Sequence, residues 1–163
     1  MTDLTISTRR RRHPGWLLAP LVILMALAPP VAPAHAADGP AVFHTSKGTF
    51  SFRLEIAETE RDREIGLMNR RSLAPDAGML FDFHTEQPVA FWMENTYIPL
   101  DMVFMAADGT VRSIHADAIP MDETPIPSGS PVRFVLEIAG GRAAEIGLRV
   151  GDKMQQSRVT PAP

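Results

Sequence analysis

The stretch FWMENTYIPLDMVFM, residues 91–105, is a long apolar run that polar side chains interrupt. Its side chains that can form hydrogen bonds include Glu94, Asn95, Thr96 and Asp101. Asn favours turn backbone, and Pro99 has no N–H to give to a strand ladder, so one continuous strand is excluded. The stretch therefore predicts a strand, a rigid turn around Asn95, Thr96 and Pro99, and a second strand over residues 100–105.

Apolar and polar residues also alternate on the N-terminal side of this stretch. In residues 50–56, FSFRLEI, every second side chain is apolar, which is the period of a strand with one buried face. Ser46, Lys47 and Gly48 precede this run and favour a turn, so a β-hairpin is predicted over residues 41–57. The same criteria predict further strands at residues 78–83, 89–94, 100–105, 111–116, 132–140 and 153–159.

Two short helices are expected among these strands. Thr59 is a good N-cap with acidic residues in the turn that follows, which predicts a helix from Glu60 to Met68. Ile65 and Met68 are three residues apart and would face the core. A second helix of one or two turns is expected over residues 142–148.

The predicted strands outnumber the predicted helices. A long irregular segment separates the strand at residues 111–116 from the strand at residues 132–140. Residues 117–131 contain four prolines and can form neither a helix nor a central strand. Short strands with turn residues between them are typical of β-sandwiches and barrels. We therefore predict a single, mainly-β sandwich or barrel-like domain over residues 37–159, with about 7–8 short strands and one or two short helices.

The first 36 residues have the features of a signal peptide. Arg9–Arg12 form a basic segment, residues 16–28 are an apolar run of 13 residues, and Ala34-His35-Ala36 fits the cleavage pattern. A membrane-spanning helix needs roughly 20 apolar residues, so this run is too short. We expect cleavage after Ala36, a periplasmic or secreted protein, and no membrane association afterwards. Residues 160–163 are expected to be a disordered tail.

Composition narrows the possible classes of function. The chain has no cysteine, which excludes disulfides, thiolate nucleophiles and cysteine zinc sites. Without residues 1–36 it has 12 Lys and Arg against 18 Asp and Glu, a net charge of about −6. It lacks the basic footprint of a nucleic-acid-binding protein, so we expect no nucleic-acid partner.

Three blocks, in order, carry a resemblance to a known family. They are EIGLMNRRSLAPDAGMLFDF (residues 64–83), FWMENTYIPLDMVFMAADGTV (residues 91–111) and TPIPSGSPVRFVLEIAGGRAAEIGLRVGD (residues 124–152). Together they resemble the domain of unknown function 192 family, over about residues 50–152. The resemblance implies a small, mainly-β, sandwich-like domain, often behind a signal peptide, and the family has no established activity to carry over. Glu94 departs from the family pattern, in which a basic residue often stands there.

Asp101 is the first candidate site residue because it lies between Leu100 and Met102 in an apolar run. A buried carboxylate without partners is very costly, so Asp101 must accept hydrogen bonds. The local donors are backbone N–H groups and the side chains of the Asn95-Thr96 turn. Asp101 is then either a structural brace or a general base or ligand at the floor of a pocket.

Other candidates for ligand contact are aromatic or basic. Phe91 and Trp92 are consecutive, so on a strand they point to opposite faces and one of them lies outside the core or under a loop. An exposed Trp92 beside Glu94 could support a ligand. Arg70 near the end of the first helix could offset the helix dipole or pair with a carboxylate such as Asp101.

Metal binding is the least favoured expectation. The part of the chain after residue 36 has seven methionines, and thioethers bind Cu(I), but no His-x-Met spacing occurs and Met also fills cores. His115 and the carboxylates of Asp117, Asp122 and Glu123 match no established metal loop. We expect no cofactor and no metal site.

Two functions of different class remain open. The first is an exported, non-catalytic binding or accessory domain whose pocket uses Trp92, Asn95, Thr96, Asp101 and Arg70. Its partner would be a small molecule, a glycan or an envelope protein. The second is a hydrolase or lyase acting on an envelope polymer, with Asp101 and either Glu94 or Asp82 as a pair of carboxylates.

Overall fold

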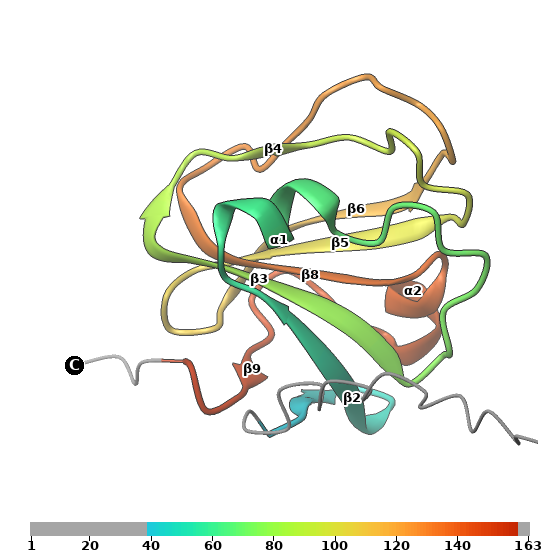
Figure 1. Cartoon of the computed structure of the whole chain (residues 1–163). Coiled ribbons are helices and arrows are strands. Elements are labelled where there is room, and N and C mark those ends of the chain that lie inside the picture. The colour runs from blue at the N-terminus through green and yellow to red at the C-terminus, as the bar shows by residue number, and fades with distance from the viewer. Residues whose placement is uncertain (1–38, 160–163) are drawn as a thin grey trace, which may run out of the picture. The chain divides into compact units, whose positions relative to one another are not determined.

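Seven strands form one curled sheet that resembles half a barrel (Figure 1). The computed structural model describes residues 39–159. The predicted signal peptide, its cleavage site and the predicted tail lie outside these residues. Among residues 39–159, no helix is long and apolar enough to cross a membrane.

The elements follow one another along the chain with short connections. They are β1 (Ala41–Thr45), β2 (Gly48–Ala57), α1 (Glu60–Ile65), β3 (Ala77–Gln87), β4 (Ala90–Phe91), β5 (Leu100–Met105), β6 (Val111–Ala118), β7 (Ile126–Pro127), β8 (Val132–Ala139), α2 (Arg142–Ile146) and β9 (Met154–Gln155). The sheet order is β6-β5-β8-β3-β2-β1-β9, and β4 pairs with β7 separately. A mainly-β fold with two short helices is confirmed for the described residues.

β8 is the central strand, with β5 on one side and β3 on the other. Its sequence VRFVLEIA has no turn former, and six of its eight residues are buried. Both of its pairings are antiparallel, whereas β2 and β3 run parallel. A parallel pair needs a crossover, and here α1 and the loop after it provide that crossover.

The predicted strand limits hold well for the hairpin and less well elsewhere. β1 and β2 pair as expected, from Ala41 opposite Phe52 to Thr45 opposite Gly48, around the turn between them. β3 continues to Gln87, four residues beyond the end of the strand predicted at residues 78–83. It does so because His84 adopts φ 64° and the pairing with β8 shifts register beyond Asp82, which is a β-bulge.

The first helix ends three residues earlier than predicted. Thr59 caps it as expected, since its hydroxyl accepts the N–H of Asp62 at 3.1 Å. Gly66 then turns the chain at φ 47°. The prediction that Ile65 faces the core is wrong: Ile65 is 49% exposed, and Leu67, at 2%, is buried instead because the helical period stops at Gly66.

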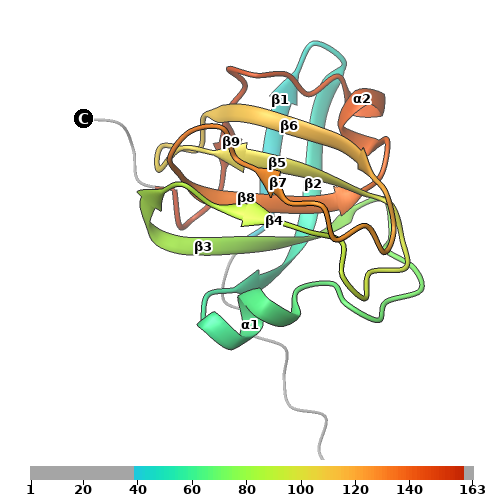
Figure 2. The same ribbon diagram turned by 90° about the horizontal axis from the view of Figure 1, so that it is seen from above.

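Side chains on the two faces of the sheet form two separate cores. On β8, Phe134, Leu136 and Ile138 pack into the first core, with β1, β2 and α2. Val132 and Val135 pack into the second core, with Phe81 and Phe104 among others. Figures 1 and 2 show β4 and β7 lying over this second face, with α1 beside them. The candidate pocket lies on this second face.

Candidate functional site

Asp101 is fully buried, and both of its carboxylate oxygens are occupied by the backbone. Oδ1 accepts the N–H groups of Asp117 at 2.8 Å and Gly141 at 2.9 Å. Oδ2 accepts the N–H of Ala143 at 2.7 Å. The expectation that the Asn95-Thr96 turn supplies donors is not met by these bonds, because the donors lie 16 to 42 residues away in the sequence. The geometry is that of a brace joining β5 to the end of β6 and the start of α2.

Two glycines allow the backbone to come this close to Asp101. A Cβ on Gly140 would lie 2.8 Å from Cβ of Pro99 and 2.9 Å from Oδ1 of Asp117. The N–H of Gly140 also donates to the carbonyl of Pro99 at 2.9 Å. Gly141 adopts φ 79°, a left-handed conformation that suits glycine. Gly140 and Gly141 are therefore part of the brace.

The predicted turn at Asn95 and Thr96 is present and is tied to two other loops. Asn95 has φ 52°, and its carbonyl accepts the N–H of Asn69 at 2.7 Å. The carbonyl of Thr96 accepts the N–H of Met121 at 3.1 Å, and its side chain donates to the carbonyl of Glu94. These bonds connect the turn to the loop after α1 and to the proline-rich segment.

Arg70 pairs with Glu55 rather than with Asp101. Its guanidinium makes two bonds to the carboxylate of Glu55, at 2.5 and 2.6 Å. These hydrogen bonds raise the pKa of Arg70 above its ordinary value. The pair joins β2 to the loop after α1, and neither of its members lines the pocket described below.

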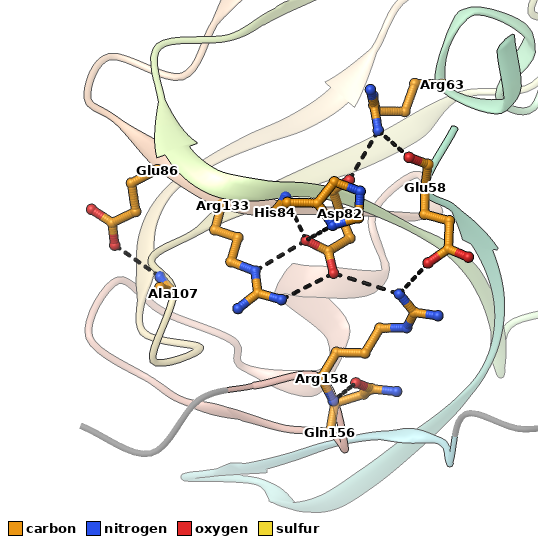
Figure 3. Close-up of polar contacts among 9 residues, drawn as sticks. All are labelled: Glu58, Arg63, Asp82, His84, Glu86, Ala107, Arg133, Gln156 and Arg158. Carbon is orange, nitrogen blue, oxygen red and sulfur yellow. Dashed lines mark hydrogen bonds and ion pairs between the residues drawn. The ribbon is translucent and has the colours of Figure 1, made fainter. Parts of the chain in front are cut away.

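Asp82, a possible second carboxylate of the hydrolase hypothesis, belongs to a buried ion-pair cluster (Figure 3). Nε of Arg133 donates to Oδ1 at 3.0 Å, the N–H of His84 donates to the same atom, and Arg158 lies 3.6 Å from Oδ2. Burial alone would raise the pKa of Asp82, but the bonds from Arg133 and His84 outweigh it, and the pKa is lowered. Glu58 completes the cluster by pairing with Arg158 at 2.5 Å.

The carboxylates named by the hydrolase hypothesis do not form a pair. Asp101 lies opposite Ile138 on β8, and Asp82 lies opposite Phe134. Four residues of strand separate these positions, about 13 Å at about 3.3 Å per residue. Glycosidases place their two carboxyl groups about 5 to 9.5 Å apart. Glu94 lines a pocket that does not include Asp101.

That pocket has a volume of about 400 Å³ and lies against α1, β4 and the second face of the sheet. Half of the residues that line it are apolar: Ile65, Leu67, Met68, Phe81, Phe83, Ala90, Phe91 and Trp92. Of the residues predicted to bind a ligand, Trp92 and Thr96 line it, and Trp92 is 53% exposed. Asn95, Asp101 and Arg70 are not part of its lining.

Glu137 on β8 also lines the pocket, and sequence reasoning missed it. It is only 4% exposed, and its Oε2 has no hydrogen-bond partner among residues 39–159. Burial raises its pKa to about 8, so the side chain is largely a neutral carboxylic acid at pH 7. Its cross-strand neighbours are Met79 on β3 and Met102 on β5. The sequence feature that could have revealed it is a single acidic residue inside the largely apolar strand VRFVLEIA.

The pocket lining contains three further carboxylates but only one basic residue. Glu60, Glu64 and Glu94 are these carboxylates, and Arg63 is the basic residue. The guanidinium of Arg63 donates to the carbonyls of Glu58 and Asp82, and it lies 5.1 Å from the ring centre of Phe83. The pocket therefore combines apolar walls with a surplus of negative charge.

A second hollow, of about 430 Å³, adjoins the proline-rich segment. His115 and Asp122 line it, whereas Asp117 and Glu123 do not. Asp122 accepts the N–H of Thr124 at 2.8 Å. Within residues 39–159 no group of three or more His, Asp or Glu side chains is arranged to hold a metal ion.

The curled β-sheet with a pocket on one face defines the class of the protein as a small β domain. A family model identifies the family to which it belongs. The model of DUF192, described as Uncharacterized ACR, COG1430, matches residues 42–156. The chain belongs to this family, as the three sequence blocks had indicated. No curated protein matches the chain.

Two solved structures are similar to this chain. One is a protein from Sinorhizobium meliloti 1021 whose name suggests a transcription regulator, with 45% identity and a TM-score of 0.71. The match covers 74% of this chain and 95% of that one. The other is a protein of unknown function from Novosphingobium aromaticivorans DSM 12444, with 41% identity, a TM-score of 0.71, and coverage of 80% and 94% respectively.

Proposed function

We propose that the protein is an exported, non-catalytic binding or accessory domain that takes a small molecule into the pocket between α1, β4 and the sheet. One observation carries this proposal: the carboxyl group of Glu137 is buried in the pocket wall, and its Oε2 has no partner. Buried polar groups in folded proteins are nearly always hydrogen-bonded, so each exception requires an explanation. A ligand that bonds to Glu137 would provide one.

The shape and lining of the pocket support the same proposal. Small-molecule sites are concave, mostly apolar, and contain a few polar groups that fix orientation. Here a volume of about 400 Å³ is combined with aromatic walls and the polar side chains of Thr96 and Glu137. The exposed ring of Trp92 at the edge could stack on a flat ligand or a sugar ring.

The proposal is for binding and not for hydrolysis because Asp101, the carboxylate on which the hydrolase hypothesis rests, is engaged elsewhere in the fold. Asp101 makes three backbone bonds and Asp82 is paired with Arg133. Neither has an oxygen placed to exchange protons with a substrate in the pocket. Regulation of transcription, suggested by the name of the Sinorhizobium protein, is not proposed, because the acidic composition does not suit DNA.

Export is the second part of the proposal, and the N-terminal sequence supports it. We expect the protein in the periplasmic or extracellular fraction, with Ala37 as its first residue. Cell fractionation followed by mass spectrometry of the N-terminal peptide tests both statements. An intact N-terminus on a cytoplasmic protein would contradict them.

A thermal-shift screen of the purified protein tests the binding function. The compounds should include sugars, peptidoglycan fragments, organic amines, carboxylates and metal ions including Cu(I). A ligand of the pocket raises the melting temperature of the wild type, and Trp92→Ala weakens that rise. The matched control is Tyr97→Ala, which removes another exposed aromatic ring that does not line the pocket. If no compound of any class stabilises the protein, the binding function fails.

A further inference from the structure

We propose that the pocket is selective for a small organic amine, whose ammonium group pairs with Glu137 and whose apolar body lies among Phe81, Phe91 and Trp92. This inference rests on the proposed binding function and names its ligand class. It is drawn from the unpartnered carboxyl group at the pocket wall and from the charges around it.

The charges of the lining residues favour a cation. Glu60, Glu64 and Glu94 lie around Glu137, and Arg63 is the single basic lining residue. Arg63 directs its guanidinium to the carbonyls of Glu58 and Asp82 and over the ring of Phe83. An anionic ligand would meet a surplus of carboxylates, whereas an ammonium group would be attracted by them.

The lining chemistry favours an amine over a metal ion. Hard metal ions need several oxygen ligands, and the residues on the strands beside Glu137 in register are Met79 and Met102. An ammonium group instead needs one carboxylate and tolerates aromatic faces, which attract cations through their π electrons. Phe81, Phe83, Phe91 and Trp92 provide such faces in the same pocket.

Binding of an amine would be coupled to release of a proton. Glu137 must lose its proton before it can pair with an ammonium group, and burial holds its pKa at about 8 in the empty pocket. The charged groups that line the pocket with it are Glu60, Arg63 and Glu64 from α1 and Glu94 from the segment after β4. Glu55, which is paired with Arg70, lies in the same cross-strand row on β2. Below pH 8, the fraction of protein that is ready to bind falls about tenfold per pH unit. An alkylamine itself stays charged to about pH 10.

A matched set of three probes tests the inference on the purified protein by titration calorimetry. The probes are phenethylamine, 2-phenylethanol and 3-phenylpropanoate, which share an aromatic body and differ in charge. We expect phenethylamine to bind at least tenfold more tightly than the other two at pH 8. Its affinity should rise by roughly 50-fold from pH 6 to pH 8. At pH 7, close to one proton should be released per amine bound, measured in buffers of different ionisation enthalpy.

Two variants separate Glu137 from the other carboxylates. Glu137→Gln keeps the shape of the side chain, and it should abolish both the pH dependence and the preference for the amine. Glu64→Gln removes one exposed carboxylate of the pocket lining. It should lower the affinity for the amine by only a few-fold and keep the pH dependence of binding. If Glu137→Gln retains the wild-type pH dependence, the inference is overturned.

The outcomes also distinguish this inference from the function beneath it. If 2-phenylethanol or a neutral compound from the screen binds as tightly as phenethylamine and depends on Trp92, the amine inference fails and the binding function stands. If neither these probes nor any screened compound binds, both fail.

Discussion

Two buried acids of this sheet, Asp101 and Glu137, lie one residue step apart and have opposite surroundings. Asp101 on β5 is opposite Ile138, and Glu137 on β8 is opposite Met102. Successive residues of a strand point to opposite faces, so Asp101 faces α2 and the first core, whereas Glu137 faces the pocket. Asp101 accepts three backbone N–H bonds, whereas Oε2 of Glu137 accepts none from residues 39–159.

The comparison shows that burial of a carboxylate does not by itself identify a site. Three strong donors make a buried charge a tight link between elements, and the fold then depends on it. A buried carboxyl group without donors costs stability whenever it ionises. Such a cost is typical of groups that act on a ligand, which is why the pocket rather than the Asp101 brace carries the proposed function.

The largest expected effect concerns the pH dependence of stability. Glu137 has a pKa of about 8 in the folded state against 4.5 when unperturbed. The folded state holds this proton more strongly, so stability falls as pH rises through this window and levels off above about pH 8. The loss amounts to about 5 kcal/mol at most. Glu137→Gln should lack this loss, and urea unfolding at pH 5 and pH 9 measures it.

The wild type and Glu137→Gln share all other titrating groups. The difference between their profiles of unfolding free energy against pH is therefore the contribution of Glu137. Parallel profiles would contradict a buried, unpartnered Glu137.

The next effect is the loss of the brace. In Asp101→Asn, an amide nitrogen replaces one acceptor oxygen, so one or more of the three backbone N–H groups loses its acceptor. We expect the free energy of unfolding to fall by about 3 kcal/mol. Urea denaturation measures the change. Asp122→Asn is the control, because Asp122 accepts one backbone bond in an exposed loop and should cost less than about 1 kcal/mol.

Ligand binding to Asp101→Asn completes the contrast with Glu137. If the folded variant binds ligand normally, Asp101 is a structural residue only. If it folds with wild-type stability but loses binding, the assignment of the two acids is reversed.

Gly140→Ala tests the close approach of the backbone to the brace. Its Cβ would lie 2.8 Å from Cβ of Pro99, so one of the two segments must move. We expect a loss of about 2 kcal/mol in the free energy of unfolding. Gly39→Ala is the control, because nothing lies within 4 Å of its added Cβ. Equal stabilities of the two variants would show that the Gly140 contact is not required.

The contrast between the two acids also shows how far local sequence can predict this fold. Alternating residues predicted the β1–β2 hairpin, and Thr59 predicted where α1 begins, because both depend on neighbours in sequence. The need of Asp101 for donors was also predictable. The identity of those donors was not, since Asp117, Gly141 and Ala143 reach it only after the chain has folded.

Other features were missed because they depend on tertiary contacts. The parallel pairing of β2 with β3 leaves no local pattern, since strand direction is set by the crossover. Glu137 looked like one polar residue of a strand because period alone does not show that β4 and α1 cover its face. Trp92 and Thr96 were predicted site residues and do line the pocket. Arg70 was also predicted, but it forms an ion pair with Glu55 and does not line the pocket.

The smallest expected effect on stability is that of Trp92→Ala, which distinguishes a pocket residue from a core residue. Its side chain is 53% exposed, so Trp92→Ala should change the free energy of unfolding by no more than about 0.5 kcal/mol. Phe91, the preceding residue, contacts the rings of Phe81 and Phe104 at 5.0 and 6.0 Å, and Phe91→Ala should cost several times more. Calorimetry with any ligand found in the screen should show weaker binding by Trp92→Ala at unchanged stability. A large stability loss in Trp92→Ala, with ligand affinity kept, would assign Trp92 to the fold and leave Glu137 as the main determinant of binding.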